Sequence, residues 1–229
     1  MLTEHHFPDS ATAAVDLAAH IAALLEEAIA ARGVASIALS GGRSPKPVLE
    51  ALSGVALDWS RVIVTLVDER WVAPTDPDSN ERLIRESLLQ GPAAAARFVP
   101  MKNDAADAYA GQPACEATMV ALPWPLDVVV LGMGEDGHTA SLFPGAQELA
   151  AGLSSEARTI AVTPPAAPHE RMSLTRRAIL DSRHILLQIA GEAKTSVYDR
   201  AMAGGPVEIL PIRLALCQDA VPVDLWISA

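Results

Sequence analysis

The feature that most restricts the fold of this chain is a succession of short apolar segments, each followed by a turn and then a helical pattern. Continuous apolar runs of this kind form strands whose sheet is covered on both faces. The clearest runs are residues 34–39, 61–67, 126–131, 184–189 and 223–227, with weaker ones at 159–162 and 171–174. Strands that alternate with helices predict an α/β fold: a doubly wound, mostly parallel sheet with helices on both faces.

The segments between these runs carry helical signals. In residues 10–32, apolar side chains recur at helical spacing at Val15, Ala18, Ile21, Leu25 and Ile29. We expect Ser10 to cap this helix and Gly33 to end it. Ser44 is the expected N-cap of the next helix, with Pro45 in its first position. Gly111-Gln112-Pro113 predicts a break or kink in the region 104–121.

Length and charge limit the kinds of function that fit. The 229 residues predict a single domain, residues 1–229. A formal net charge of −11 argues against nucleic acid or an anionic membrane as partner, because both require a broad basic surface. A small anionic substrate needs only a few local cations. We therefore expect a small-molecule partner, in a protein that is a monomer or a homodimer.

The cysteine and histidine content points to a reduced compartment and to no metal. Cys115 and Cys217 form no CxxC pair, and no HExxH or comparable ligand set occurs. No signal peptide and no run of roughly 20 apolar residues is apparent. The sequence thus predicts a cytoplasmic protein without metal or cofactor.

Ligands of parallel α/β sheets bind at the carboxyl ends of the strands, and SGGRSP follows the first predicted strand. Gly41 and Gly42 let the backbone approach a ligand closely, and the start of the next helix supplies free N–H groups that suit phosphate. Arg43 and Ser44 can add side-chain donors. A plain strand-to-helix turn is the alternative, and the sequence is not a Walker loop.

Two further segments place acid, base and cation at strand ends. Asp68 and Arg70 lie in VDERW after the second strand, where a salt-bridge cluster is the simpler explanation if they are taken alone. In GMGEDGHTASLFPG, after the third strand, Asp136 and His138 follow glycines that allow tight turns. A histidine titrates near neutral pH and can act as a general base, although a lone histidine is more often structural.

Lys194 and Arg171 are candidate anion ligands. Lys194 lies near the first turn of the helix after HILLQI, where a cation opposes the helix dipole unless an anion is bound. Arg171 begins a strand after a Pro-rich loop. A solvated surface lysine is the alternative for Lys194.

Other reaction classes match poorly. GMGEDG satisfies the pattern GxGxxG, but His138 follows its third glycine and no acidic residue stands at the end of the next strand, so a dinucleotide-binding dehydrogenase is a weak rival. No GxSxG nucleophile elbow occurs, which disfavours a serine hydrolase. If the protein hydrolyses its substrate, water activated by His138 is the simplest nucleophile.

Taken together, these segments resemble the 6-phosphogluconolactonases, within the wider sugar-phosphate fold that also holds glucosamine-6-phosphate deaminases and ribose-5-phosphate isomerases. The matching stretches are SGGRSP, VTLVDERWV, DSN at 78–80, LGMGEDGHTASLFPG and AGEAK. Deaminases of this fold typically read DGHIAFNEP, with a glutamate five residues after the histidine. Phe143 occupies that position here. An apolar ring cannot relay a proton, so the resemblance favours lactone hydrolysis.

The resemblance implies the hydrolysis of 6-phospho-D-glucono-1,5-lactone to 6-phosphogluconate in the oxidative pentose phosphate pathway. It implies His138 as the general base, Asp136 as its orienting partner or a contact to a sugar hydroxyl, and Asp68 and Arg70 on the sugar side. The expected phosphate ligands are Gly41, Gly42, Ser44, Lys194 and Arg171, with Arg43 as an additional contact. A deaminase-like isomerase and a non-catalytic sugar-phosphate-binding module remain the alternatives.

Overall fold

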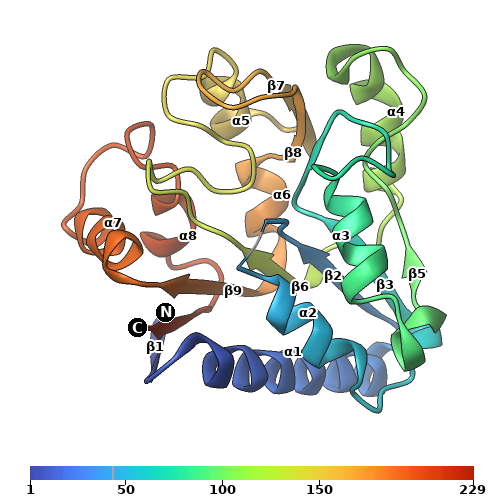
Figure 1. Ribbon diagram of the computed structural model, residues 1–229. Helices are drawn as coiled ribbons and strands as arrows, with labels where there is room; N and C mark the ends of the chain where they lie inside the picture. Colours follow the sequence, from blue (N-terminus) through green and yellow to red (C-terminus); the bar gives the residue numbers. More distant parts are fainter. Residues whose placement is uncertain (43) are drawn as a thin grey trace.

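The computed structural model describes residues 1–42 and 44–229, and it confirms an α/β fold around a seven-stranded parallel sheet (Figure 1). The strand order is β1-β10-β9-β6-β2-β3-β5. The strands are β1 (Leu2–Phe7), β2 (Ala35–Leu39), β3 (Val62–Leu66), β5 (Arg97–Phe98), β6 (Leu126–Leu131), β9 (Ser182–Ala190) and β10 (Val223–Ser228). Every residue of β2 and β6 is buried, as expected for central strands covered on both faces.

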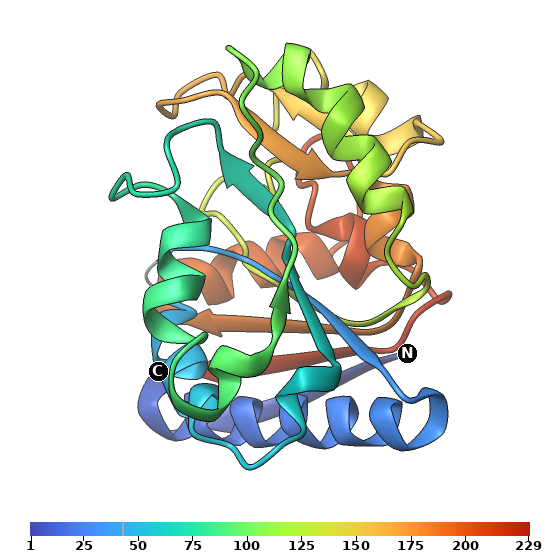
Figure 2. The same cartoon turned by 90° about the vertical axis from the view of Figure 1, so that its right-hand side faces the viewer.

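Helices cover both faces of this sheet. The helices of the described residues are α1 (Ser10–Arg32), α2 (Lys46–Ser53), α3 (Asn80–Ser87), α4 (Ala108–Val120), α5 (Leu149–Ser154), α6 (Arg176–Leu180), α7 (Glu192–Met202) and α8 (Arg213–Leu216), with short 3₁₀ helices η1 (Trp59–Arg61) and η2 (Gly91–Ala95). Of these, α4 and α5 pack against a smaller sheet beside the first. Figure 2 shows α1 beneath the sheet, and α7 and α8 on the opposite face. Among the described residues, no helix has both the length and the apolar character needed to cross a membrane.

A second, smaller sheet lies beside the first, and the sequence did not predict it. It contains β4 (Asp68–Arg70), β8 (Arg171–Leu174) and β7 (Thr159–Val162) in antiparallel order. The chain passes between the sheets at Val67, whose N–H donates to Leu39 O in β2 at 3.0 Å and whose carbonyl accepts from Leu174 N at 2.8 Å. The strands expected at 159–162 and 171–174 are present, but they belong to this antiparallel sheet.

Both predicted N-caps differ in the structure. Asp9 rather than Ser10 caps α1, and its carboxylate accepts from Thr12 N at 2.8 Å. Pro45 occupies the cap position of α2, which has no side-chain cap, so Ser44 lies one residue too early to serve.

The buried face of α1 differs in part from the predicted one, because Val15 is 64% exposed. Ala18, Ile21 and Leu25 are buried as predicted, and Ala14, Leu17 and Ala28 lie with them on the buried face of α1, because small alanines pack close against the sheet.

The break expected near residues 111–113 does not occur, because α4 runs unbroken through Pro113. Proline removes one backbone hydrogen bond, but neighbouring side chains attach this helix to β7. Gln112 donates to Thr159 O at 3.0 Å and accepts from Ala161 N at 3.1 Å. Glu116 accepts from Thr159 N at 2.7 Å. Tertiary contacts therefore outweigh the local penalty.

Candidate active site

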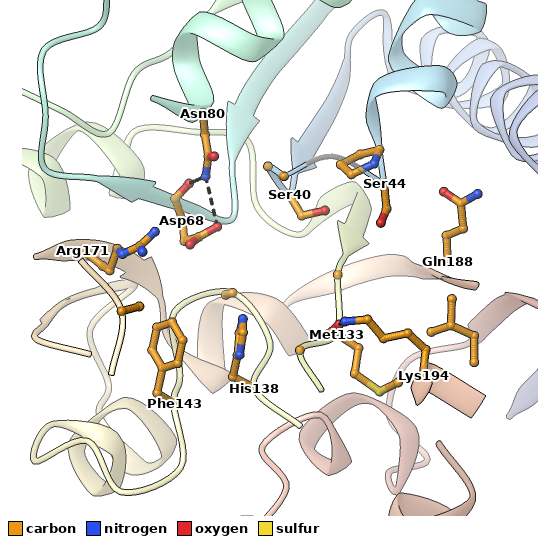
Figure 3. A pocket seen from close by; sticks show the side chains of 18 of the residues that line it. Ser40, Ser44, Asp68, Asn80, Met133, His138, Phe143, Arg171, Gln188 and Lys194 are labelled. Carbon is orange, nitrogen blue, oxygen red and sulfur yellow. Dashed lines mark hydrogen bonds between the residues drawn. The ribbon is translucent and has the colours of Figure 1, made fainter. Parts of the chain in front are cut away.

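A cleft of about 390 Å³ opens at the carboxyl ends of the parallel strands, next to the small sheet (Figure 3). Most of the residues predicted from the sequence line it. They are Gly41, Gly42, Ser44, Asp68, Arg70, His138, Arg171 and Lys194. Asp136 does not line this cleft but contacts His138, and Arg43 lies outside the described residues. Residues predicted because they follow the carboxyl ends of strands thus lie together in one cavity.

His138 and Asp136 form a hydrogen-bonded pair. Nδ1 of His138 lies 2.6 Å from Oδ1 of Asp136, and the His138 backbone N–H donates to the same oxygen at 3.1 Å. Burial alone would raise the pKa of Asp136, but the hydrogen bond and charge of His138 bring that pKa below its ordinary value. With Nδ1 bonded to the carboxylate as donor, Nε2 is left as the acceptor that a general base requires.

The backbone around His138 explains why glycines precede it. A Cβ on Gly134 would lie 2.1 Å from His138 Nδ1 and 2.4 Å from Asp136 Oδ1, so only glycine fits between them. Gly137 has φ +82°, the left-handed region that glycine adopts readily. Ala140 has φ 48°, which is uncommon for a residue with a side chain and often occurs at functional sites.

One side of the cleft is suited to an anion. Gly42, with φ 101°, and Ser44 lie there between β2 and α2. Lys194 approaches from the first turn of α7, and its ammonium donates to Met133 O. Burial lowers the pKa of Lys194, while the charges of Glu135 and Asp136 partly oppose that shift. A half-buried ammonium beside a glycine-rich turn is a chemically suitable phosphate ligand.

The other side holds two guanidinium groups. Arg70 donates to Asp78 O at 2.5 Å, and Arg171 donates to Pro168 O at 3.0 Å. The Nε atoms of both arginines are buried and have no hydrogen-bond partner within the described part of the chain. Burial and the charge of Arg70 lower the pKa of Arg171. Two guanidinium groups that line the same side of a cleft make this side suitable for an anionic or strongly polar group.

Arg171 and Lys194 are separated in the structure, although the sequence grouped both as phosphate ligands. Figure 3 shows them on opposite sides of the cleft, with His138 between them. The charged groups that influence Arg171 are Arg70 and nearby carboxylates, whereas Lys194 is influenced by Glu135 and Asp136. The two cations therefore line different sides of the cleft.

Several polar residues that contact Asp68 were not predicted from the sequence. Asn80 donates through Nδ2 to Asp68 O at 2.8 Å, and Ser141 donates to Asp68 Oδ2 at 2.6 Å. A Cβ on Gly41 would lie 1.8 Å from Asn80 Oδ1, so this glycine makes room for Asn80. The motif DSN contained Asn80, but the sequence assigned it no role.

Gln188 also lines the cleft and was not predicted. A polar residue near the carboxyl end of the apolar segment HILLQI was the available signal for it. No group of three or more His, Cys, Asp or Glu side chains capable of holding a metal ion occurs within residues 1–42 and 44–229.

Comparisons with known proteins agree with this fold. Residues 8–223 match the family model described as glucosamine-6-phosphate isomerases/6-phosphogluconolactonase. A 6-phosphogluconolactonase of Mesorhizobium japonicum is 45% identical over 222 residues, covering 96% of this chain and 92% of the relative. One of Pseudomonas putida is 43% identical, covering 97% of this chain and 91% of the relative.

The solved structures lead to the same family. A 6-phosphogluconolactonase from Shewanella baltica superposes with a TM-score of 0.98 at 44% identity, covering 100% of this chain and 98% of that one. A monomeric glucosamine-6-phosphate deaminase has a TM-score of 0.81 at 20% identity, which indicates a shared fold. By its sequence match over most of its length, this chain belongs to the glucosamine-6-phosphate isomerase/6-phosphogluconolactonase family.

Proposed function

We propose that the protein is a 6-phosphogluconolactonase, an enzyme that hydrolyses 6-phospho-D-glucono-1,5-lactone to 6-phosphogluconate in the oxidative pentose phosphate pathway. The observation that carries the proposal is the His138–Asp136 pair, which lies in a cleft with cations on both sides. The names of the relatives at 42–45% identity support it.

The geometry supports a general-base mechanism. Nε2 of His138 removes a proton from water while the water oxygen attacks the lactone carbonyl carbon, and the carbonyl oxygen becomes an oxyanion. When the tetrahedral intermediate collapses, the bond from this carbon to the ring oxygen breaks, and His138 returns the proton to that oxygen. Asp136 holds the imidazole through Nδ1 at 2.6 Å and stabilises its protonated form.

The two cationic sides suit the two polar ends of the substrate. The phosphate binds at Gly41, Gly42, Ser44 and Lys194, with Arg43 as an additional contact. Arg70 and Arg171 face the sugar end together with Asp68. Both guanidinium groups line the cleft, where their N–H groups can stabilise negative charge that develops on the carbonyl oxygen. In this proposal Arg171 contacts the lactone carbonyl end of the substrate, whereas the sequence analysis expected it to bind the phosphate.

Phe143 favours lactone hydrolysis over the isomerase reaction of the same family. Its ring lies 4.3 Å from the His138 imidazole, centroid to centroid, and its side chain is buried. An apolar ring there packs against the base but transfers no proton. A sugar isomerisation that needs a second acid beside the histidine is therefore disfavoured.

The finer points of location and assembly belong to the same proposal. Cys115 and Cys217 are both free thiols, which fits a reducing cytoplasm. We expect the enzyme to act as a monomer or homodimer on a small phosphorylated lactone, with neither nucleic acid nor membrane as partner.

Replacement of His138 by alanine tests the mechanism directly. We expect kcat to fall by roughly 10²–10⁴-fold, because that is the contribution of a positioned general base. Turnover is measured against the spontaneous hydrolysis of the lactone. His6→Ala, which removes an exposed histidine on β1, serves as the control. Wild-type turnover by His138→Ala would contradict the mechanism, and no turnover by the unaltered protein would contradict the function.

A further inference from the structure

The carboxylate of Asp68 shares the cleft with two guanidinium groups but pairs with neither. Asp68, Arg70 and Arg171 all line the same cavity, and Asp68 contributes to the charge that Arg171 experiences. Yet the ion pairs found within 4.0 Å among the described residues include none between Asp68 and either arginine. Each guanidinium donates instead to a backbone carbonyl, Arg70 to Asp78 O and Arg171 to Pro168 O. Because opposite charges attract strongly in a partly buried site, a contact that fixes the carboxylate helps to keep these groups apart.

Ser141 supplies that contact. Its hydroxyl donates to Oδ2 of Asp68 at 2.6 Å, a short hydrogen bond of the kind formed with an ionised acceptor. Asn80 donates to the backbone carbonyl of Asp68 at 2.8 Å and makes only a long contact of 3.4 Å with Oδ1. Oδ2 is therefore held by Ser141, and Oδ1 retains acceptor capacity for a ligand hydroxyl.

Ser141 is itself fixed from two directions. Its backbone N–H donates at 3.1 Å to the hydroxyl of Ser173, a residue that lies opposite Asp68 in the β4–β8 register. Along the chain, Ser141 follows His138 by three residues. Its side chain is fully buried and leaves the hydroxyl little freedom. One residue thus connects the His138 segment, the small sheet and the Asp68 carboxylate.

We propose that Ser141 is a positioning residue that acts through Asp68, because its hydrogen bond holds the Asp68 carboxylate away from Arg70 and Arg171. All three charged groups are then available to the substrate. Without the Ser141 hydroxyl, the carboxylate turns towards a guanidinium, and both partners are withdrawn from the cleft. This inference rests on the proposed lactonase function, in which Asp68 contacts the sugar.

A double-mutant cycle with Ser141→Ala and Asp68→Ala tests the inference. In the unaltered background, we expect Ser141→Ala to lower kcat/KM by about tenfold, the effect of losing one hydrogen bond to a charged group. In the Asp68→Ala background, the same substitution is expected to change kcat/KM by less than about twofold, because its only target is gone. Equal losses in both backgrounds would overturn the proposal.

Thr139→Val is the matched control. Thr139 is another fully buried hydroxyl of the same segment, and it donates to Gly132 O at 2.9 Å rather than to Asp68. Its effect is expected to be the same in both backgrounds. If Ser141→Ala does not fold, Ser141→Cys keeps a weak donor of similar size and is carried through the same cycle.

A crystal structure of the Ser141→Ala protein provides a readout that does not depend on turnover. We expect the Asp68 carboxylate in ion-pair contact with Arg70 or Arg171, and an unmoved carboxylate would overturn the proposal. Turnover of the unaltered protein is measured first. Absence of lactonase activity there contradicts the proposed function, whereas activity with an additive cycle contradicts only the role of Ser141.

Discussion

At the scale of single residues, Gly134 determines whether the His138–Asp136 pair can form. The space that its side chain would occupy contains His138 Nδ1 at 2.1 Å and Asp136 Oδ1 at 2.4 Å. The Gly134 N–H also donates to His138 O at 2.9 Å, which closes the turn. The backbone at residue 134 can thus approach the His138 imidazole closely because glycine has no Cβ.

Gly134→Ala is expected to lower kcat by about 10²-fold, because a shift of roughly 1 Å in a reacting group has an effect of that size. The measurement is steady-state lactone hydrolysis, with thermal unfolding to confirm folding. Gly132→Ala is the comparison, since its Cβ would meet nothing closer than 3.7 Å, and its loss should be much smaller. Similar losses in the two variants would contradict the argument.

Lys194 gives a prediction of a different kind. Lys194→Ala should raise KM for the phosphorylated lactone by about tenfold or more and change kcat little, because in the proposed binding mode the ammonium contacts the phosphate rather than the reacting carbon. Arg200→Ala removes an exposed cation from the same helix and should leave KM unaltered. An unchanged KM in Lys194→Ala would show that the phosphate binds elsewhere.

The cleft residues that could be predicted from the sequence are those that directly follow a predicted strand. His138, Lys194 and Asp68 each follow a predicted strand, and parallel strands bring such positions together. Ser141 could not be found in this way. Its role depends on a contact with a residue 73 positions away, in a second sheet that the apolar pattern did not reveal.

At the scale of elements, a buried glutamate attaches α3 to the small sheet. Glu69 in β4 is 1% exposed, and it accepts from the backbone N–H groups of Asn80 and Glu81 at 2.7 Å each and from Ser79 Oγ at 3.1 Å. Burial raises the pKa of Glu69, although these N–H groups oppose the shift. The carboxylate thus satisfies free N–H groups at the start of the helix and fixes Asn80 beside Asp68.

Glu69→Gln should lower the free energy of unfolding by about 1–3 kcal/mol, because the amide NH₂ then faces backbone donors that lose their acceptor. Denaturant unfolding measures the change. Glu81→Gln alters a carboxylate at the start of the same helix that pairs with Arg85 across one turn, and we expect a smaller effect. Unfolding curves of equal midpoint for the two variants would contradict this role of Glu69.

Elements that could be predicted from the sequence are stabilised by the burial of their own apolar residues. Elements that could not be predicted depend on contacts with other elements. The buried strands β2, β3 and β6 carry their own apolar pattern. The edge strand β1 has the sequence LTEHHF, in which exposed and partly buried positions are mixed. It therefore lacks the continuous apolar pattern that predicts a buried strand, and its strand conformation depends on pairing with β10. Likewise, α4 continues through Pro113 because its side chains bond to β7, a contact that local propensity does not contain.

At the scale of the whole molecule, acid sensitivity arises where β9, β10 and α1 meet. His184 in β9 lies near Asp224, His20, Glu27 and Asp127, and burial lowers its pKa from the ordinary value of 6.5. The folded protein therefore favours neutral His184, whereas the unfolded chain binds the proton more readily. Stability from this residue is complete above pH 6.5 and declines as the pH falls from there through the lower folded pKa.

His184→Gln should reduce the loss of thermal stability between neutral and mildly acidic pH. The measurement is Tm at a series of pH values that starts above 6.5 and continues below it, because the loss of stability begins as the pH falls through the unfolded pKa of 6.5. His6→Gln, at an exposed position on β1, is the control and should retain the unaltered pH dependence. Parallel Tm curves for His184→Gln and the unaltered protein would contradict the prediction.

The pairing of β1 with β10 has a consequence for how the protein forms during synthesis. In the parallel sheet β1 has β10 as its neighbour, and His5 and Asp224, whose side chains hydrogen-bond across this pair, are 219 positions apart in the chain. At the rate of translation, about 5–20 residues per second, the first strand waits roughly 10–45 s for its partner to leave the ribosome. During that interval β1 is a short segment of mainly polar residues, a composition that disfavours pairing with other strands.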